Sequence, residues 1–89
     1  MNTFPLSIIT PTGKIFEGTV ESLTAPALEG TLGILANHVP ILTLLKQGTL
    51  RIQQNQNQQN FSITRGILEV NKLHQVLILA DEASSTPKV

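Results

Sequence analysis

Hydrophobic and polar residues alternate along most of the chain, and turn-forming residues interrupt the alternation every few positions. Residues 49–53 (TLRIQ) are the clearest case, because Leu50 and Ile52 share one face. A period of two is typical of a strand with one buried face, and no segment shows a convincing helical period. The pattern predicts an all-β fold, a sandwich or barrel of about nine or ten short strands. The clearest strands are expected at residues 4–10, 14–16, 19–25, 31–35, 39–45, 49–53, 61–64, 67–70 and 75–80.

Two interruptions of the alternating pattern are read as strand boundaries. Pro26 is expected to end the strand before it, because proline cannot donate to a strand ladder. Residues 54–60 (QNQNQQN) are all amides, and alternating segments flank them on both sides. We interpret this run as a solvated hairpin loop, and the alternative is a Gln/Asn-rich interaction segment.

Residues 29–42 (EGTLGILANHVPIL) are apolar but carry glycines, a proline and an Asn-His pair. Gly30, Gly33 and Pro40 oppose a helix, because they loosen the backbone or remove a donor. Asn37 and His38 do not suit the middle of a single strand. The stretch therefore predicts two short strands joined by a tight, exposed loop with His38 at its tip.

The last apolar segment, residues 75–80 (QVLILA), is apolar on both faces. Alternation places Leu77 and Leu79 opposite Val76, Ile78 and Ala80. In a two-layer sandwich only one face of a strand meets the core. Either loops cover the outer face at a twisted end of the sheet, or a partner covers it.

Charge and composition narrow the function. Six basic and six acidic residues balance, with no basic cluster, which opposes nucleic-acid binding. No apolar run approaches the roughly 18 residues of a membrane span, and residues 1–10 lack the features of a secretory signal. We expect one cytosolic domain without direct membrane insertion. The chain contains no cysteine, so neither disulfides nor thiolate metal sites reinforce the core.

No catalytic constellation stands out. His38 and His74 lack metal-ligand spacing, the carboxylates are scattered, and no phosphate-cradling motif is present. His74 falls in a polar turn and is expected to be solvated. The sequence indicates no enzyme, metal or cofactor, and a hydrolase or lyase is disfavoured. A small-ligand-binding β-sandwich module remains the alternative, although the absence of Tyr and Trp opposes it.

Four segments resemble, in sequence and in order, the epsilon subunit family of F-type ATP synthases: TPTGKIFEGTVESLTAP, EGTLGILANHVPILTLLKQGTLRI, RGILEV and QVLILADEA. The resemblance covers residues from about 6 to 83. It implies a β-sandwich of two roughly five-stranded, mainly antiparallel sheets over residues 1–83. It also implies a non-catalytic rotor subunit of the central stalk, peripheral on the cytoplasmic face of the bacterial inner membrane. Its expected partners are the gamma subunit and the c-ring, which it would link.

The resemblance also carries residue roles. It implies c-ring contacts at the loops of the second segment, and the outer face of residues 75–80, with Leu77 and Leu79, is assigned to gamma. Many relatives have an acidic residue at the position of Thr31 and glycine at that of Asn37. Asn tolerates positive φ, so the turn is expected to survive. The expected c-ring contacts are Glu29, Gly30, Thr31, Ala36, Asn37 and His38.

Most members of the family continue into a C-terminal helical hairpin that inhibits ATP hydrolysis. Here a Ser/Thr/Pro-rich stretch follows, and we expect residues 84–89 to form a flexible tail of a naturally short subunit. Neither inhibition through that hairpin nor nucleotide binding is carried over to this chain.

Overall fold

The computed structural model describes residues 2–86, which form ten strands and no helix. The strands are β1 (Phe4–Thr10), β2 (Gly13–Val20), β3 (Ser22–Ala27), β4 (Gly30–Leu35), β5 (Ile41–Leu45), β6 (Gly48–Gln54), β7 (Asn57–Ile63), β8 (Gly66–Val70), β9 (Val76–Ala80) and β10 (Ala83–Thr86). The predicted all-β class is confirmed.

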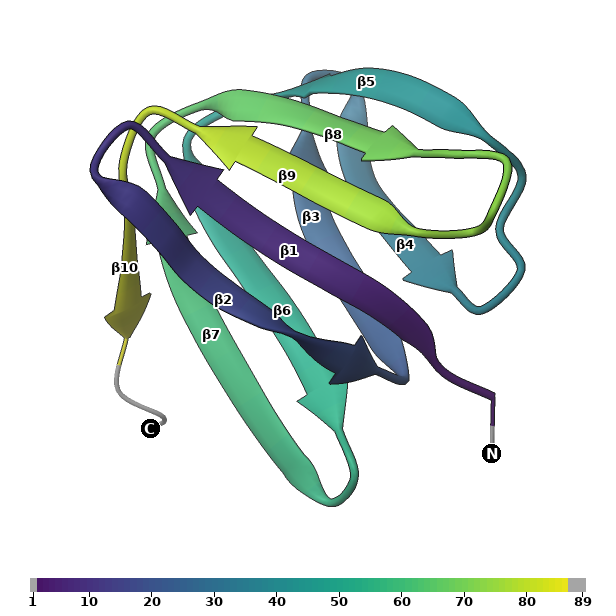
Figure 1. Cartoon of the computed structure of the whole chain (residues 1–89). Coiled ribbons are helices and arrows are strands. Elements are labelled where there is room, and N and C mark those ends of the chain that lie inside the picture. Colours follow the sequence, from purple (N-terminus) through teal and green to yellow (C-terminus); the bar gives the residue numbers. More distant parts are fainter. Residues whose placement is uncertain (1, 87–89) are drawn as a thin grey trace.

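The strands form two layers of a sandwich (Figure 1). One layer has the order β5-β8-β9-β1-β2, and the other has the order β4-β3-β6-β7-β10. A single residue pair, Ala27 with Leu45, joins β3 to β5 and makes the hydrogen bonding continuous between the layers. All pairs are antiparallel except β1 with β9, which are parallel. The expected β-sandwich with mainly antiparallel pairing is thus confirmed, but its two five-stranded layers belong to one continuous ten-stranded sheet rather than to two separate sheets.

The core lies between the layers and follows the period-two pattern. In β1, Phe4, Leu6 and Ile8 are buried, while the residues between them are more exposed. Most of the core therefore follows from strand alternation, since successive side chains point to opposite faces. The remaining buried apolar residues are Val20, Leu23, Ala25, Ala27, Ile34, Leu45, Leu50, Ile52, Phe61, Ile63, Leu68, Val70, Val76, Ile78 and Ala80.

Pro26 lies inside β3, so the prediction that it ends the strand is wrong. Its carbonyl accepts a hydrogen bond from the Lys46 amide at 2.8 Å. In an antiparallel ladder the N–H and C=O of one residue point to the same neighbour. On that edge β3 pairs with β6 at residues 22–24 and with β5 only at Ala27. The missing N–H of Pro26 therefore falls between the two partners, where it removes no ladder bond.

The amide run is a hairpin of paired strands rather than a seven-residue loop. β6 extends through Gln54, and β7 begins at Asn57, leaving a turn at Asn55 and Gln56. Asn55 has φ 55°, a left-handed conformation that asparagine tolerates in such turns. The side chain of Gln54 donates to the Thr19 carbonyl at 2.9 Å, which ties the end of β6 to β2 in the other layer.

The prediction of a flexible tail is wrong for residues 84–86. Residues 83–86 form β10, which pairs antiparallel with β7 from Ala83 opposite Ile63 to Thr86 opposite Asn60. The ladder partner comes from a distant segment, so local composition gave no sign of it. Residues 87–89 of the predicted tail lie outside the described residues.

Candidate functional site

A loop joins two short strands as predicted, but it spans residues 36–40 between β4 and β5 and so includes residues 39 and 40, which were expected in the second strand. We call this loop the tip. Asn37 has φ 65°, as expected for an asparagine in a tight turn. The His38 amide donates to the Leu35 carbonyl at 3.3 Å, and Nδ1 of His38 lies 2.7 Å from the Val39 carbonyl oxygen. Asn37 is exposed and His38 is half-buried.

His74 contacts this loop, although sequence reasoning placed it in solvent. Its Nδ1 lies 3.2 Å from the His38 carbonyl oxygen, across 36 positions of sequence. The β8–β9 turn that holds it is organised by Asn71, whose side-chain oxygen accepts from the amides of Leu73 (2.9 Å) and Gln75 (3.0 Å). No local signal could have revealed the His74 contact, because it depends on how β5 and β8 pair.

The six residues assigned to the c-ring do not form one cluster. Glu29, Gly30 and Thr31 are exposed at the start of β4, whereas Ala36, Asn37 and His38 follow its end. A strand rises about 3.3 Å per residue, so the two groups are roughly 17 Å apart. β4 pairs only with β3, which leaves its other edge unpaired among the described residues.

Four apolar residues on adjacent strands lie side by side across the outer face of the layer β5-β8-β9-β1-β2. Leu44 pairs with Ile67, Ile67 with Leu79, and Leu79 with Ile9. We call this set the outer apolar row. Leu44, Ile67 and Leu79 are 54%, 39% and 46% exposed, and Leu42 and Leu28 add further exposed apolar surface.

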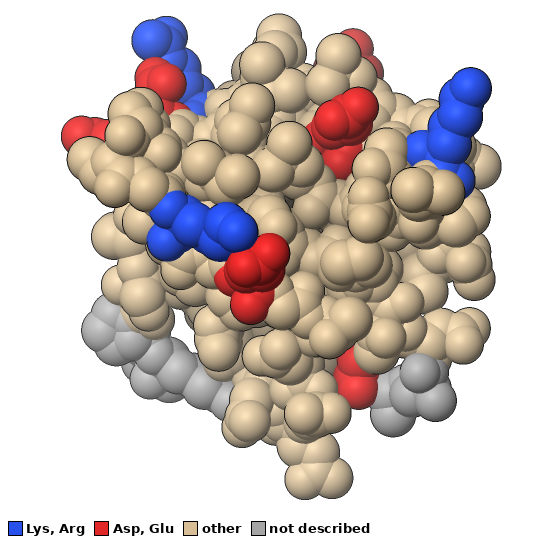
Figure 2. Space-filling view, in the orientation of Figure 1, with Lys and Arg blue, Asp and Glu red and all other residues tan. Residues whose placement is uncertain are grey.

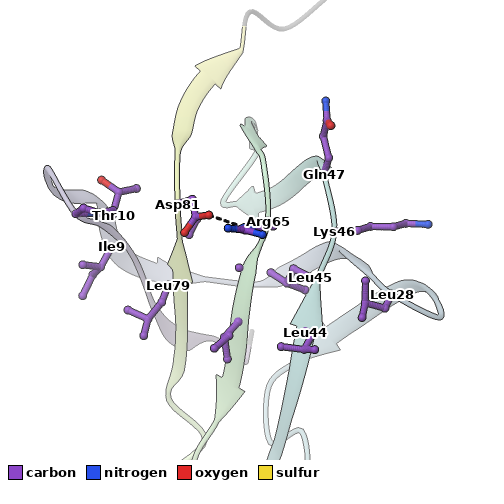
Figure 3. A pocket seen from close by; sticks show the side chains of 14 residues that line it. Ile9, Thr10, Leu28, Leu44, Leu45, Lys46, Gln47, Arg65, Leu79 and Asp81 are labelled. Carbon is purple, nitrogen blue, oxygen red and sulfur yellow. Dashed lines mark hydrogen bonds and ion pairs between the residues drawn. The ribbon is translucent and has the colours of Figure 1, made fainter.

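The outer apolar row lines an open groove of about 850 Å³ (Figure 3). Val76, Ile78 and Ala80 are buried while Leu79 is exposed and Leu77 is half-buried, so the predicted two apolar faces of this strand are confirmed. Sequence reasoning missed the contribution of β5. Residues 41–45 (ILTLL) also carry apolar residues on both faces, Ile41 and Leu45 on one and Leu42 and Leu44 on the other, and this is the signal that could have identified it.

Arg65 and Asp81 lie together at the rim of the groove (Figure 3). Nε of Arg65 donates to Oδ2 of Asp81 at 2.6 Å, and the Asp81 amide donates to the Arg65 carbonyl at 3.1 Å. The hydrogen bond to Asp81, and then its negative charge, raise the pKa of Arg65 above its ordinary value. Both side chains are largely exposed, so water and salt screen the pair.

A second hollow, of about 560 Å³, lies between β4 and β5. Its lining includes Glu29, Gly30 and Thr31 on one side and Leu42 and Leu44 on the other. The start of β4 therefore borders the apolar outer face.

Residues 2–86 contain no group of three or more His, Cys, Asp or Glu side chains placed to hold a metal ion. Within the same residues no helix is long and apolar enough to cross a membrane. Charged side chains are scattered over the face in Figure 2, which shows no cluster of one sign. The features that remain for function are the tip, the edge of β4 and the outer apolar row.

Comparison with known proteins gives consistent matches. The family model described as the ATP synthase delta/epsilon chain, β-sandwich domain, matches residues 3–86. An ATP synthase epsilon chain of Bacillus pumilus is 37% identical over 89 residues, which cover 100% of this chain and 67% of that protein. Another epsilon chain, from Nitrosococcus oceani, is 42% identical over 82 residues, which cover 91% of this chain and 58% of that protein.

The first relatives matched also include the epsilon chain of Aquifex aeolicus, and the chain spans 62% of the length of that protein. Among solved structures, a chain of the Euglena gracilis mitochondrial ATP synthase, in an assembly that includes the c-ring, superposes with a TM-score of 0.88. It is 25% identical, and the match covers 93% of this chain and 53% of that one.

Proposed function

The chain belongs to the ATP synthase delta/epsilon chain family, as its β-sandwich domain, and on this premise we propose that it is a non-catalytic rotor subunit of a proton-translocating F-type ATP synthase. In this role it links the gamma subunit to the c-ring in the central stalk, and so couples ATP synthesis to ion flow. The observation that carries the proposal is the outer apolar row, a solvent-exposed apolar face on an otherwise complete sandwich.

The outer apolar row is assigned to gamma. Leu44, Ile67 and Leu79 point away from a core that is already filled from the other face of the same strands. Apolar surface of this kind is characteristic of a protein contact. In this assignment Leu77 and Leu79 belong to the gamma-facing side.

The edge of β4 and the tip are assigned to the c-ring. Because Thr31 and His38 lie near opposite ends of β4, a small protruding partner could not touch both. A flat partner surface lying along the unpaired edge could touch both groups of residues. The loops at the end of a ring of identical subunits would offer such a surface.

A small-ligand site in the groove is the second candidate, since about 850 Å³ falls within the usual range for ligand pockets. However, the charged groups at its rim, Arg65 and Asp81, pair with each other instead of converging on the groove. This arrangement favours a protein partner over a small ligand.

The proposed location is the cytoplasmic face of the bacterial inner membrane, where the subunit is peripheral, binds no nucleotide and does not insert. The test is to tag the protein in its own cell, solubilise the membranes in mild detergent and identify what co-purifies. Gamma and c subunits in stoichiometric amounts support the proposal. Recovery of the chain with neither the gamma subunit nor the c subunit would contradict the proposal.

A further inference from the structure

The tip and the β8–β9 turn form one end of the molecule, although 36 positions separate His38 from His74 (Figure 1). Together these two loops and the end of β4 expose three large aliphatic side chains: Leu35 at 65%, Val39 at 65% and Leu73 at 74%. None of these positions entered the sequence-based assignment of contacts.

The bond between the loops has a defined direction. A carbonyl oxygen can only accept, so Nδ1 of His74 must carry the proton that it donates to the His38 carbonyl. The same argument makes Nδ1 of His38 the donor to the Val39 carbonyl. Both imidazoles therefore use Nδ1 for internal bonds.

The backbone of His74 is also constrained. Its φ is 62°, and its amide donates to the Asn71 carbonyl at 3.0 Å. A non-glycine residue with positive φ is strained and persists only where its surroundings favour it. Here the residue with the left-handed backbone has its imidazole against the tip.

We propose that His74 is a positioning residue: by donating a hydrogen bond to the His38 carbonyl, it holds the tip in the shape that faces the c-ring. Residues 36–40 lie between two strands and are outside any strand themselves. The His74 bond links them to a segment with its own internal order, the turn organised by Asn71. The statement that the tip faces the c-ring depends on the proposed function. The statement that His74 positions the tip does not.

Three substitutions of His74 distinguish the effect of its hydrogen-bond donor from the effect of its side-chain shape. In His74→Asn, the amide nitrogen can occupy the position of Nδ1, and asparagine tolerates positive φ. His74→Asp has the same shape and backbone tolerance but places an acceptor against the carbonyl. His74→Gly removes the side chain without backbone strain.

The first readout is the ¹⁵N order parameter of the Asn37 and His38 amides in the 89-residue chain, which has its own closed core. The order parameters of the parent chain and of His74→Asn should remain at about 0.85, and those of His74→Asp and His74→Gly should fall below about 0.6. Order parameters that fall in all three variants, or in none, would overturn the proposal.

The second readout is made in membranes. The chain has no cysteine, so Val39→Cys provides a single attachment point for cross-linking to the c subunit. Loss of one hydrogen bond is worth about 0.5–1.5 kcal/mol, so adding His74→Asp should lower the yield roughly 2- to 10-fold, while His74→Asn preserves it. If the amides loosen but Val39→Cys alone gives no cross-link to the c subunit, the proposed ring contact fails and the positioning role stands. If His74→Asp leaves the yield of this cross-link unchanged, the statement that His74 holds the tip in the shape that faces the c-ring is overturned.

Discussion

Phe16 and Phe61 meet edge to face across the two layers, with ring centroids 5.9 Å apart and an interplanar angle of 67°. Phe16 belongs to β2, the last strand of one layer, and Phe61 belongs to β7 of the other. β2 and β7 do not pair in a ladder, so side chains hold this side of the sandwich together. The Gln54 bond to Thr19 reinforces the same side.

Phe16→Ala should lower the free energy of unfolding by about 1–3 kcal/mol, below the full cost of a buried phenylalanine because Phe16 is only partly buried. Urea denaturation followed by circular dichroism measures the change. Ile15→Ala is the matched control, since Ile15 is adjacent and exposed. Equal stability of Phe16→Ala and Ile15→Ala would contradict a structural role for the aromatic pair.

Gly66→Ala should destabilise the domain by about 1–3 kcal/mol or more, because a Cβ there would clash with the Leu79 carbonyl oxygen. Gly66 lies between β5 and β9, so neither neighbour can move without disturbing its ladder. Gly33→Ala is the control, since nothing lies within 4 Å of the position that its methyl group would occupy. Thermal unfolding of both variants tests the prediction, and a Tm for Gly66→Ala at or above that of Gly33→Ala would refute it.

Leu79→Asp should leave the isolated domain folded, because the side chain faces the groove and is 46% exposed. A change of about 0.5–1 kcal/mol is expected. In cells, the variant should fail to co-purify with gamma, since a charge would be buried at the apolar contact. Ile78→Asp is the contrast: Ile78 is fully buried, and an unpaired charge there should unfold the domain. Normal assembly of Leu79→Asp would exclude the outer apolar row as the gamma contact.

Asn37→Asp combined with His38→Glu should spare folding and weaken the coupling of ATP hydrolysis to proton pumping. The tip is a loop, and aspartate tolerates the φ of 65° at position 37. Asn55→Asp with Gln56→Glu adds the same charges in a turn that also has a positive φ at its asparagine. Acidification of membrane vesicles by ATP is the readout. Equal pumping by the two double variants would remove the tip from the ring contact.

Local sequence was sufficient for most of the strands, for the division of their side chains between two faces, and for the tip turn. The side-chain direction in a strand reverses at each residue, so alternation alone placed Leu79 on the face opposite Val76, Ile78 and Ala80. The structure shows that Val76, Ile78 and Ala80 form the core side. The turn at Asn37 was likewise predictable, because asparagine tolerates the positive φ of such a turn. The resemblance to a known family supplied the functional assignment beyond these local features.

The pairing of distant strands decided the rest. Pro26 is accommodated within β3 because two different strands adjoin it, and residues 83–86 form a strand because the edge of β7 is available. The same pairing places Leu44, Ile67, Leu79 and Ile9 in one row. It also brings His74 to the carbonyl of His38. These relationships depend on register between segments far apart in the chain, and no periodicity within a single segment encodes that register.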